Sequence, residues 1–312
     1  MKIIITGGTG FVGANLVRYF LKKGDEVNIL LRPKSNVQRL EGVLDYVRIY
    51  QCDSFEDLEK LADLCKIIAP DVVVHCAAYG TRPFRLGVPY QTNIDEMIRT
   101  NVIGTSNLMR ACEGLDLDAF INIGSSSEYG IQDKAMCEVG PINPISIYGA
   151  TKASATLLGE VMARQVNFPI YTLRLFAVYG KFEDPTRLIP TIISGAINNK
   201  MISLSSPHPV RDFVHVNDVA VAINVLIGSQ ALSGIYNLCT GKQWSIAEVV
   251  ATVEEVLAEK LNIRYGDVAL QPNEPQSWVG DPNKLKSIGW EPRTLTEGIK
   301  DLLYPDRFTR FN

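Results

Sequence analysis

KIIITGGTGFVG, residues 2–13, decides the fold of this chain. Its first five residues form a short, mostly β-branched run that predicts a strand, and helical periodicity begins at Phe11. Between them, Gly7, Gly10 and Gly13 are spaced as GxxGxxG. Glycine permits a tight turn and a close backbone approach to a pyrophosphate, while a helix N-terminus supplies free amides and a partial positive charge. In this strand–turn–helix context the segment predicts a dinucleotide site.

The same alternation of strand and helix continues through the first half of the chain. The strands are apolar on both faces, which is typical of a parallel sheet covered by helices on both sides. A doubly wound α/β sheet is therefore predicted, that is, a Rossmann fold. Strands are expected at 2–6, 26–31, 46–51, 71–77, 120–125 and 171–176, and helices at 11–23, 55–68, 93–112 and 148–165.

After residue 177 the pattern becomes irregular and richer in proline. We expect helices near 188–198, 217–228 and 245–260. This predicts a Rossmann domain over 1–176, to which segments near 211–240 return. The remainder, 177–312, is expected to be mainly a smaller, mixed α/β substrate-binding domain.

Composition narrows the class of protein further. The 312 residues carry a net charge of −3, so no general attraction to nucleic acid is implied. The six cysteines are scattered without a CxxC pair, which indicates reduced core cysteines. Only three apolar residues follow Met1 and Lys2, too few for a signal peptide or a membrane span. We expect a cytoplasmic protein without a metal site, a membrane or a nucleic-acid partner.

ILLRPKSN, residues 29–36, ends the second predicted strand. In this fold that strand end lies beside the adenosine ribose, where a carboxylate would accept hydrogen bonds from the ribose hydroxyls and repel a 2′-phosphate. This chain has Arg32 and Lys34 there, and the next acid along the chain is Glu41. Arginine can stack on adenine and pair with a phosphate. The segment therefore favours NADP(H) over NAD(H), although a solvated basic loop is the plainer alternative.

YGATK, residues 148–152, places Tyr148 and Lys152 on one face of a predicted helix. An ammonium group close to a tyrosine favours the phenolate, so the pair predicts a tyrosine that exchanges a proton with a carbinol or carbonyl oxygen. Ser125, at the end of a predicted sheet strand, could donate a hydrogen bond to the same oxygen. A plain serine-rich turn is the alternative for residues 125–127.

Together these segments resemble the extended short-chain dehydrogenase/reductase family, in its nucleotide-sugar branch (the NAD-dependent epimerase/dehydratase superfamily). The resemblance spans nearly the whole chain, with the motifs in the expected order. The matching segments are TGGTGFVG (6–13), Asp53, HCAA (75–78), NVIGT (101–105), GSSSEYG (124–130), YGATK (148–152), LRLFAVYG (173–180), RDFVHVND (211–218), YNLCTG (236–241) and GW-P (289–292).

The resemblance implies roles for individual residues. Tyr148 would be the acid/base, Lys152 would hold the nicotinamide ribose and lower the tyrosine pKa, and Ser125 would orient the sugar oxygen. Arg211 would pair with the diphosphate of the substrate. The expected cofactor-binding residues are Gly7, Thr9, Gly10, Phe11, Val12, Gly13, Arg32, Lys34, Asp53, Ser54, Ala77, Ala78, Tyr79, Asn101, Tyr148 and Lys152, and the expected substrate-binding residues are Tyr79, Ser126, Ser127, Arg187 and Arg211.

Three reactions share this scaffold in the family: 4-epimerisation, 4,6-dehydration and 4-keto reduction. Dehydratases carry an acid where this chain has Ser126 and Ser127, and Glu128 stands one position too late. Epimerases hold NAD through an acid at the end of strand two, where Arg32 stands here. The GSSSEYG and HCAAYGTR segments also look like those of sugar 4-ketoreductases. We therefore predict NADPH-dependent reduction of a nucleotide-linked 4-keto-6-deoxy sugar, with an NAD-dependent 4-epimerase as the alternative and a 4,6-dehydratase behind both.

Two departures from the family pattern affect the expected substrate. Ala177 stands where asparagine usually contacts the diphosphate, and Gln271 replaces a late arginine. An NADPH-dependent reductase of a non-nucleotide ketone therefore stays open. A non-catalytic NADP(H)-binding regulator is a further alternative, although Tyr148 and Lys152 are intact. Apolar residues around two helices predict a homodimer, namely Met97, Val102, Leu108, Met109, Leu157, Leu158 and Val161.

Overall fold

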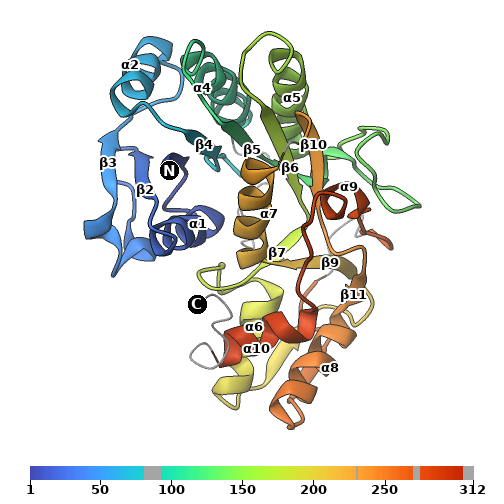
Figure 1. Ribbon diagram of the computed structural model, residues 1–312. Helices are drawn as coiled ribbons and strands as arrows, with labels where there is room; N and C mark the ends of the chain where they lie inside the picture. The colour runs from blue at the N-terminus through green and yellow to red at the C-terminus, as the bar shows by residue number, and fades with distance from the viewer. Residues whose placement is uncertain (81–92, 230, 270–274, 305–312) are drawn as a thin grey trace.

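The computed structural model of the chain describes residues 1–80, 93–229, 231–269 and 275–304. Its larger part is built on a seven-stranded sheet whose strands all run parallel (Figure 1). In spatial order they are β10 (Gly234–Leu238), β6 (Ile170–Leu175), β5 (Ala119–Ser125), β4 (Val72–His75), β1 (Lys2–Thr6), β2 (Glu26–Leu31) and β3 (Arg48–Gln51).

Chain order reverses beside β1. β2 and β3 extend from it in one direction, whereas β4, β5, β6 and β10 extend in the other. Ligands of open α/β sheets bind at the carboxyl ends of the strands at such a reversal. The predicted doubly wound sheet is confirmed.

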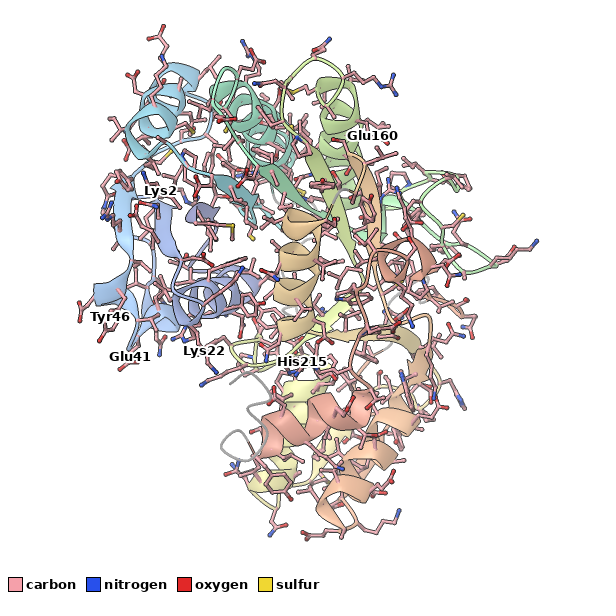
Figure 2. All side chains as sticks on the ribbon, in the orientation of Figure 1. Lys2, Lys22, Glu41, Tyr46, Glu160 and His215 are labelled. Atoms are coloured by element: carbon pink, nitrogen blue, oxygen red, sulfur yellow. The ribbon has the colours of Figure 1, made fainter. Side chains whose placement is uncertain are left out.

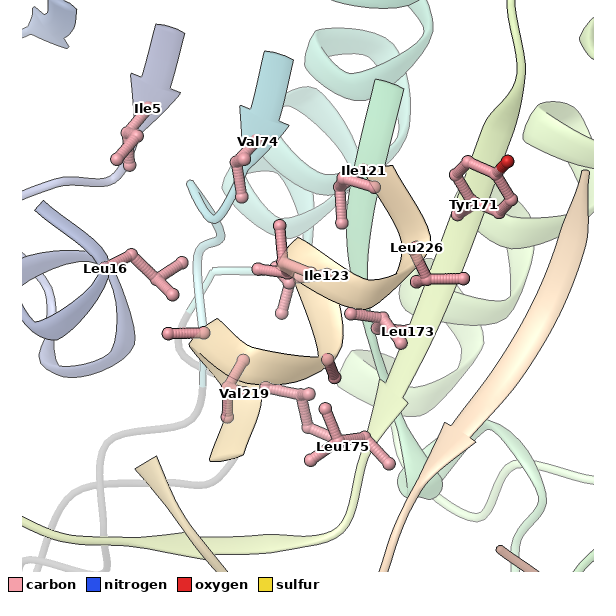
Figure 3. Packing of buried hydrophobic residues seen from close by; sticks show 14 of the residues in the cluster. Ile5, Leu16, Val74, Ile121, Ile123, Tyr171, Leu173, Leu175, Val219 and Leu226 are labelled. Atoms are coloured by element: carbon pink, nitrogen blue, oxygen red, sulfur yellow. The ribbon is translucent and has the colours of Figure 1, made fainter. Parts of the chain in front are cut away.

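Helices cover both faces of this sheet (Figure 1). Strand alternation divides the core accordingly: Ile3 and Ile5 of β1 face one hydrophobic cluster and Ile4 faces the other. Figure 3 shows the first cluster, in which Leu16 and Val219 approach the sheet from their helices. One face carries α1 (Phe11–Lys22) and α7 (Val216–Gly228), and the other carries α2 (Leu58–Ile68), α4 (Thr105–Ala111) and α5 (Ile147–Met162).

The helix predicted over 93–112 has a π-helical centre. A short α-helical turn, α3 (Ile94–Met97), leads into the π-helical segment η3 (Ile98–Gly104), and α4 continues from it. Wide π turns are uncommon and occur often at functional sites. Nothing in the spacing of the apolar residues distinguishes a π-helical turn from an α-helical one, so the sequence did not predict it.

The smaller part of the molecule is mixed α/β and has its own hydrophobic cluster. It holds a three-stranded and a two-stranded sheet, with α8 and α10 packed together below the larger sheet in Figure 1. Its elements are β7 (Ala177–Tyr179), α6 (Leu188–Ile197), β8 (Ile202–Leu204), β9 (Val210–His215), β11 (Gln243–Ser245), α8 (Ile246–Leu257), β12 (Ile263–Tyr265) and α10 (Leu295–Leu303). The short helix α9 (Asn283–Lys286) instead packs against β10, and its Leu285 belongs to the core of the larger part.

The region 211–240 is shared between the two parts. β9 pairs with β7 and β11 in the small sheet, α7 packs against α1, and β10 completes the large sheet beside β6. The junction is polar: Asp218 accepts hydrogen bonds from the backbone and side chain of Arg293, and His215 lies 3.5 Å from Asp301 of α10 (Figure 2).

Short 3₁₀ turns complete the described elements. Two of them, η1 (Gln38–Leu40) and η2 (Leu44–Tyr46), separate β2 from β3, and the third, η4 (Ser126–Glu128), follows β5. All six cysteines are free thiols. Within the described ranges, no helix combines the length and the apolar character that a membrane crossing needs.

Candidate active site

The glycine turn between β1 and α1 depends on close backbone contacts. Gly7 has a left-handed φ of +65°, and its carbonyl accepts the Gly10 N–H at 2.9 Å. A Cβ on Gly13 would lie 2.2 Å from the Gly7 oxygen, so no side chain fits there. No side chain caps the start of α1, and no acid lies in its first turn. The free amides and the helix dipole suit an anionic group such as a pyrophosphate.

A cleft of about 300 Å³ opens beside this turn, at the carboxyl ends of β1, β2 and β4. This volume lies at the lower end of ligand-binding clefts. Seven of the predicted cofactor residues are not on its walls, namely Phe11, Val12, Gly13, Lys34, Asn101, Tyr148 and Lys152. The lining residues are Gly7, Thr9, Gly10, Leu30, Leu31, Arg32, Ser35, Asp53, Ser54, Phe55, Glu56, Cys76, Ala77, Ala78, Tyr79, Glu96, Arg99 and Thr100.

The end of β2 presents one predicted cation to the cleft. The exposed side chain of Arg32 lines it, and Ser35 follows after a turn closed by Ser35 N–H to Arg32 O at 3.2 Å. Lys34 occupies the left-handed position of that turn, with φ +64°, and lies outside the lining. The acidic residues that line the cleft, Asp53, Glu56 and Glu96, do not belong to the end of β2. Asp53 forms an ion pair with Lys60 at 2.8 Å.

Half of the residues that line the cleft were not predicted from the sequence. Glu96, Arg99 and Thr100 reach the cleft from the helical run that includes η3. Their spacing of three and four residues is the signal that puts them on one helical face. Phe55 and Glu56 follow Asp53 and Ser54 directly. Only the tertiary packing of this helical run against the strand ends showed that these residues line the cleft.

A hydrogen-bond chain fixes the wall formed by the end of β4. The Thr105 hydroxyl donates to the Asn101 carbonyl at 2.7 Å, so it accepts from His75 Nε2 at 3.0 Å. His75 Nδ1 then accepts from the Thr6 hydroxyl at 2.8 Å, and Thr6 Oγ1 accepts the Ala77 N–H at 3.1 Å. Burial, together with the nearby Lys152 ammonium, lowers the pKa of His75 to about 3, so the ring is neutral.

Asn101 acts on the cleft through Tyr79. Its amide oxygen accepts the Tyr79 N–H at 2.8 Å, and its amide nitrogen donates to Tyr79 O and to Thr151 Oγ1, each at 3.0 Å. These contacts engage both donor hydrogens and the oxygen of the buried amide, and Asn101 does not line the cleft, so its direct contact with a cofactor stays a prediction. Asn101 positions Tyr79, which lines the cleft.

The predicted catalytic residues meet where β5 and α5 approach each other. Ser125 is the last residue of β5, and its side chain hydrogen-bonds that of Tyr148. Ser146 caps α5 by accepting the Gly149 N–H at 3.0 Å. A Cβ on Gly149 would lie 2.4 Å from Ser127 O, so glycine lets the helix start press against the serine loop.

Tyr148 lies close to this cleft, although it is not one of the lining residues. A Cβ on Gly80 would lie 3.7 Å from its ring, and Gly80 directly follows the lining residue Tyr79. Lys152 is 2 % exposed. The phenol of Tyr148, the hydroxyl of Ser125 and the buried amine of Lys152 are therefore available near this cleft for a reaction that transfers hydride.

The pKa shifts differ from the sequence prediction. Burial and the carboxylate of Glu128 raise the pKa of Tyr148 to about 12, against the lowering effect of its hydrogen bond with Ser125. Burial lowers the pKa of Lys152, and the charge of Glu128 opposes that shift. The pKa of Tyr148 is thus raised in the protein alone, whereas the sequence predicted that Lys152 would lower it.

Glu128 is not placed as a proton donor to a substrate. It is fully buried, accepts the Ser125 N–H at 2.8 Å and pairs with the Nε of fully buried Arg174 at 2.8 Å. Both carboxylate oxygens are thus held by the protein. This removes the one residue that could have supplied an acid for dehydration in this loop.

The predicted substrate residues are only partly gathered. Ser126 is buried and accepts the indole N–H of Trp278 at 3.0 Å. The Arg211 guanidinium lies over the Trp278 ring, 5.9 Å from its centroid, which ties Arg211 to the same corner. Arg187 lies elsewhere, at the start of α6, and pairs with Glu183 at 3.4 Å. Trp278 had no motif to mark it in the sequence.

Three positions complete the comparison with the predicted site. Ser127 donates its N–H to Ser125 Oγ at 3.1 Å and therefore stays beside the catalytic hydroxyl. Ala177 begins β7. Gln271, which replaces the late arginine, lies outside the described residues.

The comparisons with known proteins agree with this geometry. Residues 3–239 match the model of the NAD dependent epimerase/dehydratase family. The low-salt glycan biosynthesis protein Agl12 of Haloferax volcanii is 30 % identical, over 96 % of both chains. The GDP-6-deoxy-D-talose 4-dehydrogenase of Aggregatibacter actinomycetemcomitans is 27 % identical, over 98 % of both chains.

This chain also resembles a solved structure of a known enzyme. The UDP-glucose 4-epimerase of Thermus thermophilus, in complex with NAD, superimposes with a TM-score of 0.80 at 25 % identity and covers 97 % of this chain and 98 % of its own. This chain belongs to the NAD dependent epimerase/dehydratase family. The description of this family names NAD as the cofactor and epimerases and dehydratases as its enzymes.

Proposed function

We propose that this member of the epimerase/dehydratase family is a 4-epimerase of a nucleotide-linked sugar, working with NAD. The observation that carries a reaction at C4 is the Ser125–Tyr148 hydrogen bond close to the cleft, with buried Lys152 on the same helix as Tyr148. The engagement of Glu128 by Arg174 and by Ser125 argues against the dehydratase branch.

The choice among C4 reactions reverses the order that the sequence favoured. A 4-ketoreductase was the first prediction and a 4-epimerase its alternative. The relatives and solved structures support the alternative better, because the UDP-glucose 4-epimerase of Thermus thermophilus shares the fold over nearly the whole chain and binds NAD. We therefore put epimerisation first.

The residues of the chain fit a nicotinamide dinucleotide. The uncapped start of α1 and the Gly7–Gly13 turn suit its pyrophosphate, and the cleft between Arg32 and Asp53 suits its adenosine. A bound nicotinamide supplies hydride exchange with the sugar C4 carbon.

The catalytic side chains would handle the proton. The Tyr148 oxygen takes the proton of the C4 hydroxyl during oxidation and returns it during reduction. Ser125 holds the sugar oxygen in line with Tyr148. The buried Lys152 ammonium, one helical turn after Tyr148, stabilises the negative charge that develops on oxygen, where a low dielectric strengthens its effect.

NADPH-dependent 4-keto reduction is the second candidate, and Arg32 favours it. Its side chain lines the cleft at the end of β2, and no carboxylate stands at that strand end. An arginine there suits a 2′-phosphate. The 4-dehydrogenase of Aggregatibacter actinomycetemcomitans is a relative whose name describes redox chemistry at C4.

One experiment separates the two candidates. The purified protein is incubated with UDP-glucose and with other UDP-, dTDP- and GDP-sugars, each with NAD⁺ or NADP⁺, and the C4 configuration is followed by NMR. Epimerisation predicts interconversion without net change in nicotinamide absorbance. A reductase instead consumes NADPH stoichiometrically with a 4-keto-6-deoxy sugar. Turnover in neither format would overturn both.

A homodimer belongs to the same proposal. Leu157, Leu158 and Val161 of α5 are exposed at 48 %, 38 % and 51 %, and Ile98 and Ile103 of η3 are exposed beside them. Such a contiguous apolar surface suits a second copy of the chain. Three residues of the original prediction, Met97, Leu108 and Met109, are buried in the subunit, so they are wrong as interface residues.

The location is part of the proposal as well. Six free cysteines are typical of a reducing compartment, which supports the cytoplasm.

A further inference from the structure

Glu128 is a buried carboxylate next to Ser125, one of the proposed catalytic residues. It ends the turn η4, and its side chain is 0 % exposed. Burying an isolated carboxylate is costly, so such groups are held by partners. Its Oε1 accepts the Ser125 N–H, and its Oε2 accepts the Arg174 Nε–H, both at 2.8 Å.

The carboxylate fits tightly against the strand end. A Cβ on Gly124 would lie 2.7 Å from Glu128 Oε1 and 2.8 Å from Thr172 Cγ2, so only glycine leaves room for it. Ser125 in turn accepts the Ser127 N–H at 3.1 Å and holds an extended backbone, with φ −150° and ψ 142°. The carboxylate therefore fixes the backbone that carries the Ser125 hydroxyl.

Arg174 anchors the carboxylate to the sheet. It projects from β6, is 0 % exposed, and its guanidinium carbon lies 4.3 Å from the centroid of the Tyr129 ring. The Tyr129 hydroxyl donates to Asn237 Oδ1 of β10 at 2.7 Å. A buried ion pair contributes little net stability compared with an apolar pair of the same shape, because both charges lose their hydration. A role beyond stability is therefore worth testing.

We propose that Glu128 is a positioning residue for the catalytic pair: held by Arg174, its carboxylate fixes Ser125 and sets the electric field in which the Tyr148 hydroxyl ionises. This rests on the proposed function in so far as Tyr148 and Ser125 are its catalytic groups. Glu128 touches neither cofactor nor sugar in this role and acts through the two residues that do.

Charge supports the proposal. A carboxylate facing a phenol disfavours the phenolate, and after burial Glu128 is the second cause that raises the pKa of Tyr148. For Lys152, burial lowers the pKa and the charge of Glu128 opposes that shift. The carboxylate therefore favours the protonated phenol, which is the state that donates a proton to the C4 oxygen in the reduction half of the proposed reaction. The titratable and charged groups that face this cluster are Glu128 from η4, Arg174 from β6, Tyr129 beside η4, Tyr148 and Lys152 from α5, and His75 and Cys76 from the end of β4.

The test is a direct titration of Tyr148 in the full chain, which needs no substrate. Tyrosine labelled with ¹³C at Cζ is followed by NMR, and the Tyr148 signal is assigned by its loss in Tyr148→Phe. In the wild type we expect no Tyr148 ionisation up to pH of about 11, since its pKa is about 12. In Glu128→Gln the amide oxygen can still accept the Ser125 N–H, and we expect the midpoint to fall by about one pH unit or more.

A double variant guards against misfolding. Glu128→Gln alone leaves Arg174 buried without its partner, whereas Glu128→Gln/Arg174→Met removes both charges, and the midpoint should fall less but stay below that of the wild type. The matched control is Glu138→Gln, which removes a carboxylate that accepts the Asn237 N–H at 2.8 Å on the far side of the same network. It should leave the Tyr148 titration unchanged.

The titration distinguishes failure of the positioning role from failure of the proposed function. An unchanged Tyr148 midpoint in both Glu128 variants, with folding confirmed by circular dichroism, would overturn the positioning role even if the enzyme turns over nucleotide sugars. A lowered midpoint in both, with the control unchanged, supports it even if no substrate is found. Where a substrate is found, the pH dependence of kcat should move in the same direction as the titration.

Discussion

Trp278 donates its indole N–H to the hydroxyl of Ser126 across 3.0 Å. The two residues are far apart in the sequence, and the bond joins the segment before α9 to the turn that follows β5. Trp278 is itself held by Asp212, whose N–H donates to its carbonyl at 3.0 Å, and by Gln243, which accepts its N–H at 3.1 Å. The small sheet is thereby fastened to the residue next to the catalytic serine.

Trp278→Phe tests whether this bond shapes the substrate side of the site. The ring is retained but the donor is lost, which leaves buried Ser126 without that partner. We expect the KM for the sugar to rise about fivefold, equivalent to about 1 kcal/mol, with cofactor affinity unchanged. Steady-state kinetics and a cofactor titration measure both. Trp244→Phe, on β11, is the matched control, and an equal rise in its KM would contradict the assignment.

Tyr148→Phe tests catalysis against a purely regulatory role. The phenyl ring keeps the packing but cannot carry a proton, so we expect kcat to fall by about 10²–10⁴-fold while cofactor binding is retained. The comparison of kcat with a fluorescence titration of the cofactor decides this. A variant that retains full activity would remove Tyr148 from the mechanism.

Arg32→Ala tests the cofactor preference. Because Arg32 is the residue of the β2 end that lines the cleft with a cationic side chain, its loss should weaken NADPH binding by about tenfold and leave NADH binding nearly unchanged. Isothermal titration of both cofactors gives the ratio. Arg48→Ala removes an exposed arginine of β3 that pairs with Glu26, and it should not alter the ratio. A wild-type protein that clearly prefers NADH would favour the epimerase and leave Arg32 without the role.

His215→Asn tests a pH dependence of stability. Burial and the nearby Arg293 lower the pKa of His215 to about 3, well below the usual 6.5. Between those values the unfolded chain binds a proton that the folded chain excludes. The stability from the neutral ring is therefore complete above pH 6.5 and is lost as the pH falls toward 3, at about 1.4 kcal/mol per unit.

Asparagine can keep the cap that His215 provides to the Asn217 N–H, so the variant should fold. We expect its free energy of unfolding to depend on pH by one proton less than that of the wild type over this window, as measured by urea unfolding. Glu183, whose pKa burial raises to about 7, works in the opposite direction, but it is common to both proteins. His208→Asn is the reference for losing an exposed histidine. Parallel curves for wild type and His215→Asn would contradict the prediction.

Val161→Glu tests the homodimer. Val161 is half exposed on α5 beside Leu157, and a charge there would have to be buried in the predicted interface. We expect a dimer for the wild type and a monomer for the variant by light scattering at micromolar concentration. Leu232→Glu changes an apolar residue that is 83 % exposed elsewhere and should leave the dimer intact. A monomeric wild type would remove the interface.

The sequence by itself predicted six of the seven strands of the large sheet and the glycine turn proposed to bind the cofactor. Strand–helix alternation and the glycines at 7, 10 and 13 depend on local geometry, which a sequence carries directly. The spacing of Tyr148 and Lys152, with Ser125 at a strand end, predicted the proposed catalytic residues for the same reason. Composition and motifs also pointed to the family before any contact was known.

Only the tertiary structure decided what those residues touch. The local sequence pattern could not show that Glu128 forms an ion pair with Arg174 of β6. Nor could it show that the Asn101 amide hydrogen-bonds the Tyr79 backbone, or that Trp278 hydrogen-bonds Ser126. Each of these contacts joins segments distant in sequence, and each depends on which strand ends and helix faces meet. The pKa of Tyr148 follows the same rule, because burial and the facing carboxylate of Glu128 outweigh what the adjacent Lys152 alone would predict.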